Sequence, residues 1–216
     1  MVVKRMKTDL RKRQIIDAAR WLIVTYGSEH VTIRKIAAAV GISESAIYRH
    51  FRTKEDILLQ LGKYIEETLI RDIQQGNNDE QSTIEIIDTI LRNHISAIEQ
   101  HKGVSFQIIA EILSLGDKNL NKELSGVVNR YIEQFAGLLS RGIKSGEIRA
   151  DVTPVTAATL LFGMIQGLVN IWALNNYSFD LVEHYIPLWN LYKETITASP
   201  LLSKAVVRSE SIVGII

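Results

Sequence analysis

The fold of this chain is decided by residues 32–58, which read TIRKIAAAVGISESAIYRHFRTKEDIL. Thr32 can cap a helix with an apolar inner face, and Gly41 follows that helix, where a C-terminal glycine is favoured. Ser43 can cap a second, very short helix. Two short helices separated by the tight turn Gly41-Ile42-Ser43 have the dimensions of a helix-turn-helix, with a support helix followed by a recognition helix.

The short second helix has one apolar and one polar face. Ile47 and Phe51 are four residues apart and face inward. The opposite stripe carries hydroxyl, phenol and guanidinium groups, which suit phosphate oxygens and base edges: Glu44, Ser45, Tyr48, Arg49 and Arg52. Lys54 begins the next helix, where its ammonium and the free N–H groups of the first turn can hold one phosphate. The alternative is a solvated face of a helical hairpin, which the glycine turn and the basic charge disfavour.

The charge is unevenly distributed along the chain. Residues 1–60 hold 12 Lys and Arg against 6 Asp and Glu, whereas residues 61–216 hold 13 against 18. A basic segment joined to a mildly acidic remainder favours contact with a polyanion, although chance clustering gives the same balance. The basic segment from Lys4 to Arg13 is either a further contact to the DNA backbone or minor groove, or a solvated terminus.

The rest of the chain has helical periodicity and no strand-like alternation. An amphipathic helix ends before Gly27, and Thr53 with Asp56 can cap the helix that follows the recognition helix. Further helices are predicted at about 81–101, 104–115, 118–145, 154–176 and 179–198, with a polar loop at 74–79. We therefore expect an all-α fold of about nine helices, with a DNA-binding helix-turn-helix domain over 1–53 and a helical ligand-binding and dimerisation domain over 54–216.

The first 60 residues also match a known pattern. The matching residues are Thr32, Ile36-Ala37, Val40-Gly41-Ile42-Ser43 and the run Ile47-Tyr48-Arg49-His50-Phe51-Arg52-Thr53-Lys54-Glu55. In these residues the sequence resembles the tetracycline-repressor (TetR) family of transcriptional regulators. The resemblance implies a homodimer with a small-molecule pocket in each helical body. It also implies which residues contact DNA. The phosphate contacts are Thr32, Ser43, Tyr48, His50 and Lys54, and the residues nearest the bases are Ser45, Ala46 and Arg49. Arg34 completes the expected DNA-binding set.

Residues 152–179 contain no charged side chain, which raises the question of a transmembrane helix. Polar residues recur along one stripe of this segment, against a membrane span: Thr156, Thr159, Gln166 and Asn170. A helix that is apolar on most sides also suits a subunit interface. We expect a homodimer held through about 154–198 and no membrane partner.

The predicted body contains candidate ligand-binding residues but no recognisable catalytic or metal-binding motif. These are His94, Phe106, Glu111, Tyr131, Phe135, Phe162 and Trp172, although aromatic residues at helical spacing often form plain core. Their apolar character predicts a hydrophobic or amphipathic effector. His94 and His101 share a helical face but have no further ligand nearby, so no metal site is expected. No catalytic motif is visible, which favours a regulator over a helical enzyme that uses the body cavity.

The chain contains no cysteine, and no apolar segment follows the charged N-terminus. Both features suit a cytoplasmic protein. We therefore expect a ligand-responsive regulator, a repressor rather than an activator, that binds double-stranded operator DNA and needs no cofactor other than a small effector. No pattern in the sequence identifies the inducer, the operator or the regulated genes.

Overall fold

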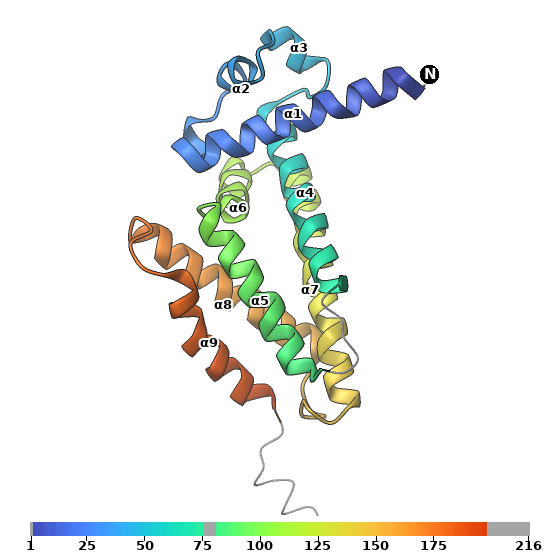
Figure 1. Ribbon diagram of the computed structural model, residues 1–216, viewed down its shortest axis with the longest axis vertical. Coiled ribbons are helices and arrows are strands. Elements are labelled where there is room, and N and C mark those ends of the chain that lie inside the picture. Colours follow the sequence, from blue (N-terminus) through green and yellow to red (C-terminus); the bar gives the residue numbers. More distant parts are fainter. Residues whose placement is uncertain (1, 76–80, 198–216) are drawn as a thin grey trace, which may run out of the picture.

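The computed structural model describes residues 2–75 and 81–197 (Figure 1). Within these ranges the chain forms nine α-helices, one 3-10 turn and no strand beyond a single bridge between Ile148 and Thr197. The elements are α1 (Val2–Tyr26), η1 (Ser28–His30), α2 (Ile33–Val40), α3 (Glu44–Tyr48), α4 (Lys54–Gln75), α5 (Thr83–Gln100), α6 (Val104–Leu115), α7 (Lys118–Lys144), α8 (Pro154–Leu174) and α9 (Leu181–Ile196). The all-α prediction is confirmed. Most of the predicted loop at 74–79, and the tail after Pro200, lie outside the described residues.

The helix ends follow the capping residues that the sequence predicts. The Thr32 hydroxyl accepts a hydrogen bond from the Lys35 N–H at 3.2 Å, and Gly41 ends α2 with φ of 73°. The left-handed region is open to glycine at little cost, so the turn between α2 and α3 is tight. The Ser43 hydroxyl accepts from the Ala46 N–H at 3.2 Å and begins α3. Asp56 and Thr53 exchange hydrogen bonds at the start of α4.

The basic segment at the N-terminus is helical in the structure. The helix predicted before Gly27 extends back to Val2, so α1 is 25 residues long. Figure 1 shows α1 lying across the end of the body, with α2 and α3 on its far side. The segment from Lys4 to Arg13 is therefore an extension of α1, and its backbone has a fixed direction.

Two buried clusters organise the packing. The first joins α1, α2 and α3 to the start of α4, and it extends to Ile108 and Ile112 of α6. The second fills the body among α5, α7, α8 and α9. Because α4 contributes Ile57 and Leu58 to the first cluster and Ile73 to the second, it connects the two. We call residues 2–53 the head and the remaining described residues the body.

The helix α8 is the one described helix long and apolar enough to cross a bilayer by length and composition. Of its most apolar stretch, 39% is buried inside the protein. The core helix of a soluble protein passes the same test, so this finding is weak evidence for a span. Trp172 and Leu161 of α8 are buried in the body core, while Leu160 and Leu174 are exposed.

Candidate nucleic-acid interface and ligand cavity

The residues expected to contact DNA gather on the outer face of the head. Ile47 and Phe51 are buried, so they set the orientation of the short helix α3. The side chains that then face outward are exposed: Thr32, Arg34, Ser43, Ser45, Tyr48 and Arg49. Ala46, His50 and Lys54 are half-buried beside them. The arrangement presents hydroxyl, phenol and guanidinium groups together on one surface, as a phosphate-binding and base-contacting helix requires.

This outer face is electrostatically positive. Burial lowers the pKa of His50, and the nearby cations Lys12, Arg11 and Arg49 lower it further. Lys12 and Arg11 belong to α1, so the long first helix brings its basic residues to the side of α3. Such a field attracts a polyanion and favours association with DNA before any base contact forms.

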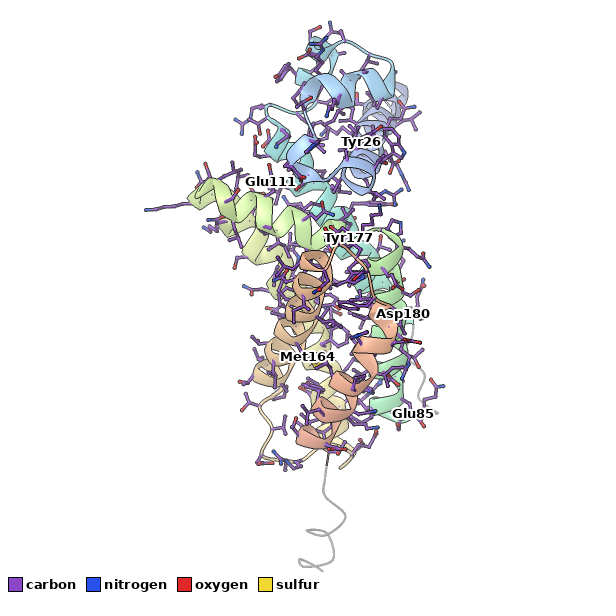
Figure 2. The ribbon with its side chains drawn as sticks, turned by 90° about the vertical axis from the view of Figure 1, so that its left-hand side faces the viewer. Tyr26, Glu85, Glu111, Met164, Tyr177 and Asp180 are labelled. Atoms are coloured by element: carbon purple, nitrogen blue, oxygen red, sulfur yellow. The ribbon has the colours of Figure 1, made fainter. Side chains whose placement is uncertain are left out.

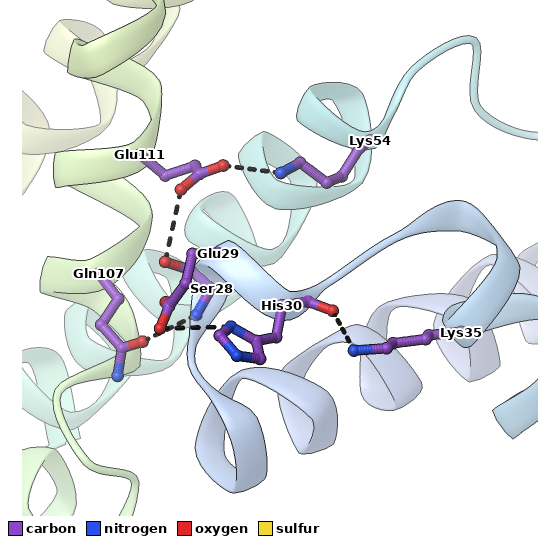
Figure 3. A network of polar contacts seen from close by, with 7 residues as sticks. All are labelled: Ser28, Glu29, His30, Lys35, Lys54, Gln107 and Glu111. Carbon is purple, nitrogen blue, oxygen red and sulfur yellow. Dashed lines mark hydrogen bonds and ion pairs between the residues drawn. The ribbon is translucent and has the colours of Figure 1, made fainter.

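Lys54 is already engaged within the protein. Its ammonium donates to Glu111 Oε1 of α6 at 2.7 Å, and both side chains are about one-fifth exposed, at 21% and 19%. The other carboxylate oxygen of Glu111 accepts from the Ser28 hydroxyl at 3.5 Å, and Gln107 accepts from the Ser28 N–H at 3.2 Å (Figure 3). This network joins α4 and η1 to α6.

Glu111 lies outside the body cavity for which it was a candidate. It lines an open cleft at the boundary of head and body, with Tyr26 and Tyr177 (Figure 2). The reason is its position around the axis of α6. Phe106 and Ile109 face the cavity, whereas Glu111 points to the other side of the same helix. Its carboxylate contacts Lys54 and Ser28.

The body contains an apolar inner cavity between α4, α5, α6, α7 and α8. Four of the expected ligand-binding residues line it: His94, Phe106, Tyr131 and Phe162. Most of the remaining wall is aliphatic and includes Ile65 and Leu69 of α4. Its free volume is only about 80 Å³, whereas pockets that hold drug-sized ligands measure roughly 300–1,000 Å³. A large ligand must therefore displace the walls.

An outer cavity of about 210 Å³ lies beside the inner one, toward the head. It shares five wall residues with the inner cavity: Ile65, Leu69, His94, Ile98 and Ser105. Its other walls are more polar and include Arg20 of α1, Asp72 of α4 and His101 of α5. The inner cavity is thus apolar and lies in the body, and the outer cavity is more polar and lies beside the DNA-binding head.

Two of the expected ligand-binding aromatic residues belong to the core instead. Phe135 is 2% exposed and packs against Tyr131 with ring centroids 5.1 Å apart. Trp172 is 3% exposed, and its indole N–H donates to the Phe179 carbonyl at 2.8 Å. Neither is among the residues lining the described cavities. Helical periodicity shows that such a residue points inward, and it does not show whether packing leaves space beside it.

The sequence reasoning missed the contribution of α4 and α1 to the cavities. Ile65 and Leu69 of α4 and Arg20 of α1 were not among the expected ligand-binding residues. Their place in the walls depends on how α1 and α4 cross α5, which no local pattern records. No group of three or more metal-ligating His, Cys, Asp or Glu side chains occurs in the part of the chain that the structure describes.

His94 is one of two polar residues, with Ser105, in the wall that the two cavities share. It is 2% exposed, and burial lowers its pKa to about 4, so the imidazole is neutral at pH 7. Its Nδ1 lies 3.0 Å from the hydroxyl of Tyr131, a phenol whose pKa is raised by burial. Its Nε2 has no hydrogen-bond partner in the described part of the chain, and Asp72 Oδ2 is 4.0 Å away.

Two family models together match most of the chain. One describes bacterial regulatory proteins of the tetR family and matches residues 15–61. The other describes the C-terminal region of YsiA-like proteins and matches residues 60–194.

Two curated proteins are among those similar to this chain in sequence. The fatty acid metabolism regulator protein of Bacillus subtilis is 28% identical over 78% of this chain and 87% of that protein. The nucleoid occlusion factor SlmA of Photobacterium profundum is 27% identical over 86% of this chain and 94% of that protein.

Solved structures show the same fold. The FadR regulator of Bacillus subtilis, in complex with stearoyl-CoA, superposes with a TM-score of 0.69 at 27% identity and covers 84% of this chain and 95% of its own. The fatty acid degradation regulator FadR of Bacillus halodurans gives a TM-score of 0.74 at 23% identity, covering 84% of this chain and 97% of that one.

Proposed function

The chain belongs to the TetR family of bacterial regulatory proteins, and we propose that it is a repressor released from its operator by a long-chain acyl-CoA. As a family member it is a ligand-responsive, DNA-binding transcriptional regulator. One observation carries the choice of effector: an apolar cavity in the body adjoins a more polar cavity beside the head. An acyl-CoA has the same order of parts, with an alkyl chain at one end and a phosphate-bearing nucleotide at the other.

Cationic side chains near the outer cavity can contact the phosphates of such a ligand. Arg20 lines the outer cavity with Asp72, and a neighbouring cavity that shares Tyr64 with it is lined by Lys12 and Arg13 together with Asp9, Asp17 and Glu67. Arg13 donates to the Tyr64 hydroxyl at 2.9 Å, which fixes α1 against α4 at this point. Cationic side chains of this kind bind phosphate oxygens. The bound effector would then contact α1 of the DNA-binding head directly.

The same contacts link the ligand cavity to the DNA-binding head. The acyl chain needs more room than the inner cavity offers, so binding must move its wall, which includes Ile65 and Leu69 of α4. The first turn of α4 carries Lys54, held by Glu111 of α6. Movement of α4 against α6 therefore changes the placement of the head. A ligand acts in this way only if it binds one head placement more tightly than the other.

The proposal is tested by titrating stearoyl-CoA into the free protein and into its operator complex. Linkage requires that the two affinities differ by the factor with which the ligand weakens DNA binding, typically about 5–150-fold. Free coenzyme A is the control, because it lacks the chain that fills the apolar cavity. Equal affinities for the free protein and the complex would show that the acyl-CoA does not regulate DNA binding.

We also propose that the outer face of the head is the DNA contact. Replacing Tyr48 with alanine should weaken binding to operator and scrambled duplexes by similar factors, because a phosphate contact carries no sequence information. Replacing Arg49 with alanine should cost about 1–3 kcal/mol on the operator and little on the scrambled duplex if the guanidinium contacts a base. Binding curves for both variants on both duplexes measure this difference. Equal losses on the two duplexes for Arg49→Ala would remove the base contact from the proposal.

The active species is proposed to be a dimer held through α8 and α9. The two helices lie side by side on one face of the body (Figure 2). Large apolar side chains are exposed along them, as expected where a second subunit packs: Val155, Leu160, Ile171, Leu174 and Leu191. A two-fold axis through this face presents two heads and predicts an operator with inverted half-sites. A regulator of this kind would act in the cytoplasm, where the chromosome lies.

A further inference from the structure

The wall between the two cavities contains a buried ring nitrogen that has no hydrogen-bond partner among the described residues. His94 is 2% exposed and lines both cavities, so its ring lies in the wall that they share. Its Nδ1 lies toward Tyr131, which lines only the inner cavity. Its Nε2 lies on the side of Asp72, which lines only the outer one. The two ring nitrogens therefore lie toward different cavities.

The direction of the hydrogen bond to Tyr131 determines which ring nitrogen holds the proton. Among the described residues the Tyr131 hydroxyl is paired with His94 Nδ1, and we assign the phenol as the donor because this is the acceptor within its reach. When the phenol donates to Nδ1, the proton of the neutral ring resides on Nε2, which becomes a donor. Asp72 Oδ2, at 4.0 Å, is beyond hydrogen-bond distance from Nε2. A buried donor without an acceptor is costly and rare in folded proteins.

We infer that His94 Nε2 donates a hydrogen bond to the thioester carbonyl of a bound acyl-CoA, and that it thereby fixes the alkyl chain in the inner cavity and the coenzyme in the outer one. The inference rests on the proposed function and adds the group that sets the position of the ligand. In an acyl thioester the carbonyl is the polar group between the alkyl chain and the coenzyme. Within the shared wall, Ser105 is the other polar side chain, and the remaining three residues are aliphatic.

The test compares two ligands that differ in this carbonyl alone. Stearoyl-CoA contains the thioester, and S-octadecyl-CoA has a methylene in place of the carbonyl. The wild-type protein should bind the thioester about 5–10-fold more tightly, which is the contribution expected of one net hydrogen bond. His94→Leu should bind both ligands equally, with about the wild-type affinity for the thioether. His94→Gln restores an N–H donor at a similar reach and should regain part of the preference.

The design separates a specific role from a structural one. Phe162→Leu changes the wall of the inner cavity and should weaken both ligands by the same factor, leaving their ratio unchanged. His94→Phe is a second variant without a donor should His94→Leu fail to fold. Isothermal titration of each folded variant gives both affinities.

Each outcome decides between the two claims. Equal binding of the two ligands by the wild-type protein, or a thioester preference that persists in the variants without a donor, overturns the role of His94 and leaves the acyl-CoA effector in place. Failure of both ligands to bind overturns the proposed effector, and the inference falls with it. A preference present in the wild type, absent in His94→Leu and partly regained in His94→Gln establishes the inference.

Discussion

Replacing Ile171 with glutamate should convert the protein to a monomer and reduce operator binding by at least about 100-fold. Ile171 is 56% exposed in the single chain and lies on the face that α8 and α9 share. Burying an unpaired carboxylate costs several kcal/mol. Because a two-fold interface contains the residue twice, both copies contribute to the effect. Light scattering at micromolar concentration measures the mass, and a gel shift with a two-half-site duplex measures DNA binding.

The exposure of Ile171 makes this substitution informative. Leu168 lies one turn earlier, but it is 7% exposed and packs in the body core, so a charge there would unfold the chain as well. Leu113 of α6 provides the matched control, since it is 57% exposed and apolar but belongs to another surface. Leu113→Glu should remain dimeric and bind DNA as the wild type does. A dimeric Ile171→Glu protein would place the interface elsewhere than on the proposed face.

Replacing Arg130 with alanine should lower the free energy of unfolding by about 3 kcal/mol. Arg130 of α7 donates two hydrogen bonds to Glu66 of α4, at 2.6 and 2.7 Å. The Glu66 side chain is only 5% exposed, so removal of its partner leaves a buried carboxylate unpaired. We place the effect at the low end of the range for buried pairs because the Arg130 side chain is 52% exposed. Urea denaturation followed by circular dichroism measures the loss.

Two further variants isolate the cause of this loss. The double variant Glu66→Gln/Arg130→Ala should recover much of the stability, because a neutral amide is easier to bury than an unpaired charge. Lys63→Ala breaks the exposed pair between the same helices, in which Lys63 and Glu123 are 34% and 53% exposed, and should cost less than about 1 kcal/mol. Equal losses for Lys63→Ala and Arg130→Ala would mean that burial of Glu66 does not govern the strength of the pair.

The sequence by itself determined the elements that depend on neighbouring residues. Thr32, Gly41 and Ser43 fixed the ends of α2 and α3, because a cap acts on backbone groups within one turn. Periodicity identified the body helices to within about two residues, since one apolar stripe suffices to define an amphipathic helix. The outward stripe on α3 followed from the same periodicity once Ile47 and Phe51 were assigned inward.

Only the tertiary structure decided which of the inward residues border free space. Phe106 and Phe135 have the same signal in the sequence, yet one lines the inner cavity and the other is packed on all sides. The difference arises from how the helices cross, which depends on contacts between residues far apart in the chain. The pairing of Lys54 with Glu111, 57 positions apart, has the same origin. Local physics thus set the helices and the DNA-facing stripe, whereas long-range packing set the cavities and their connection to the head.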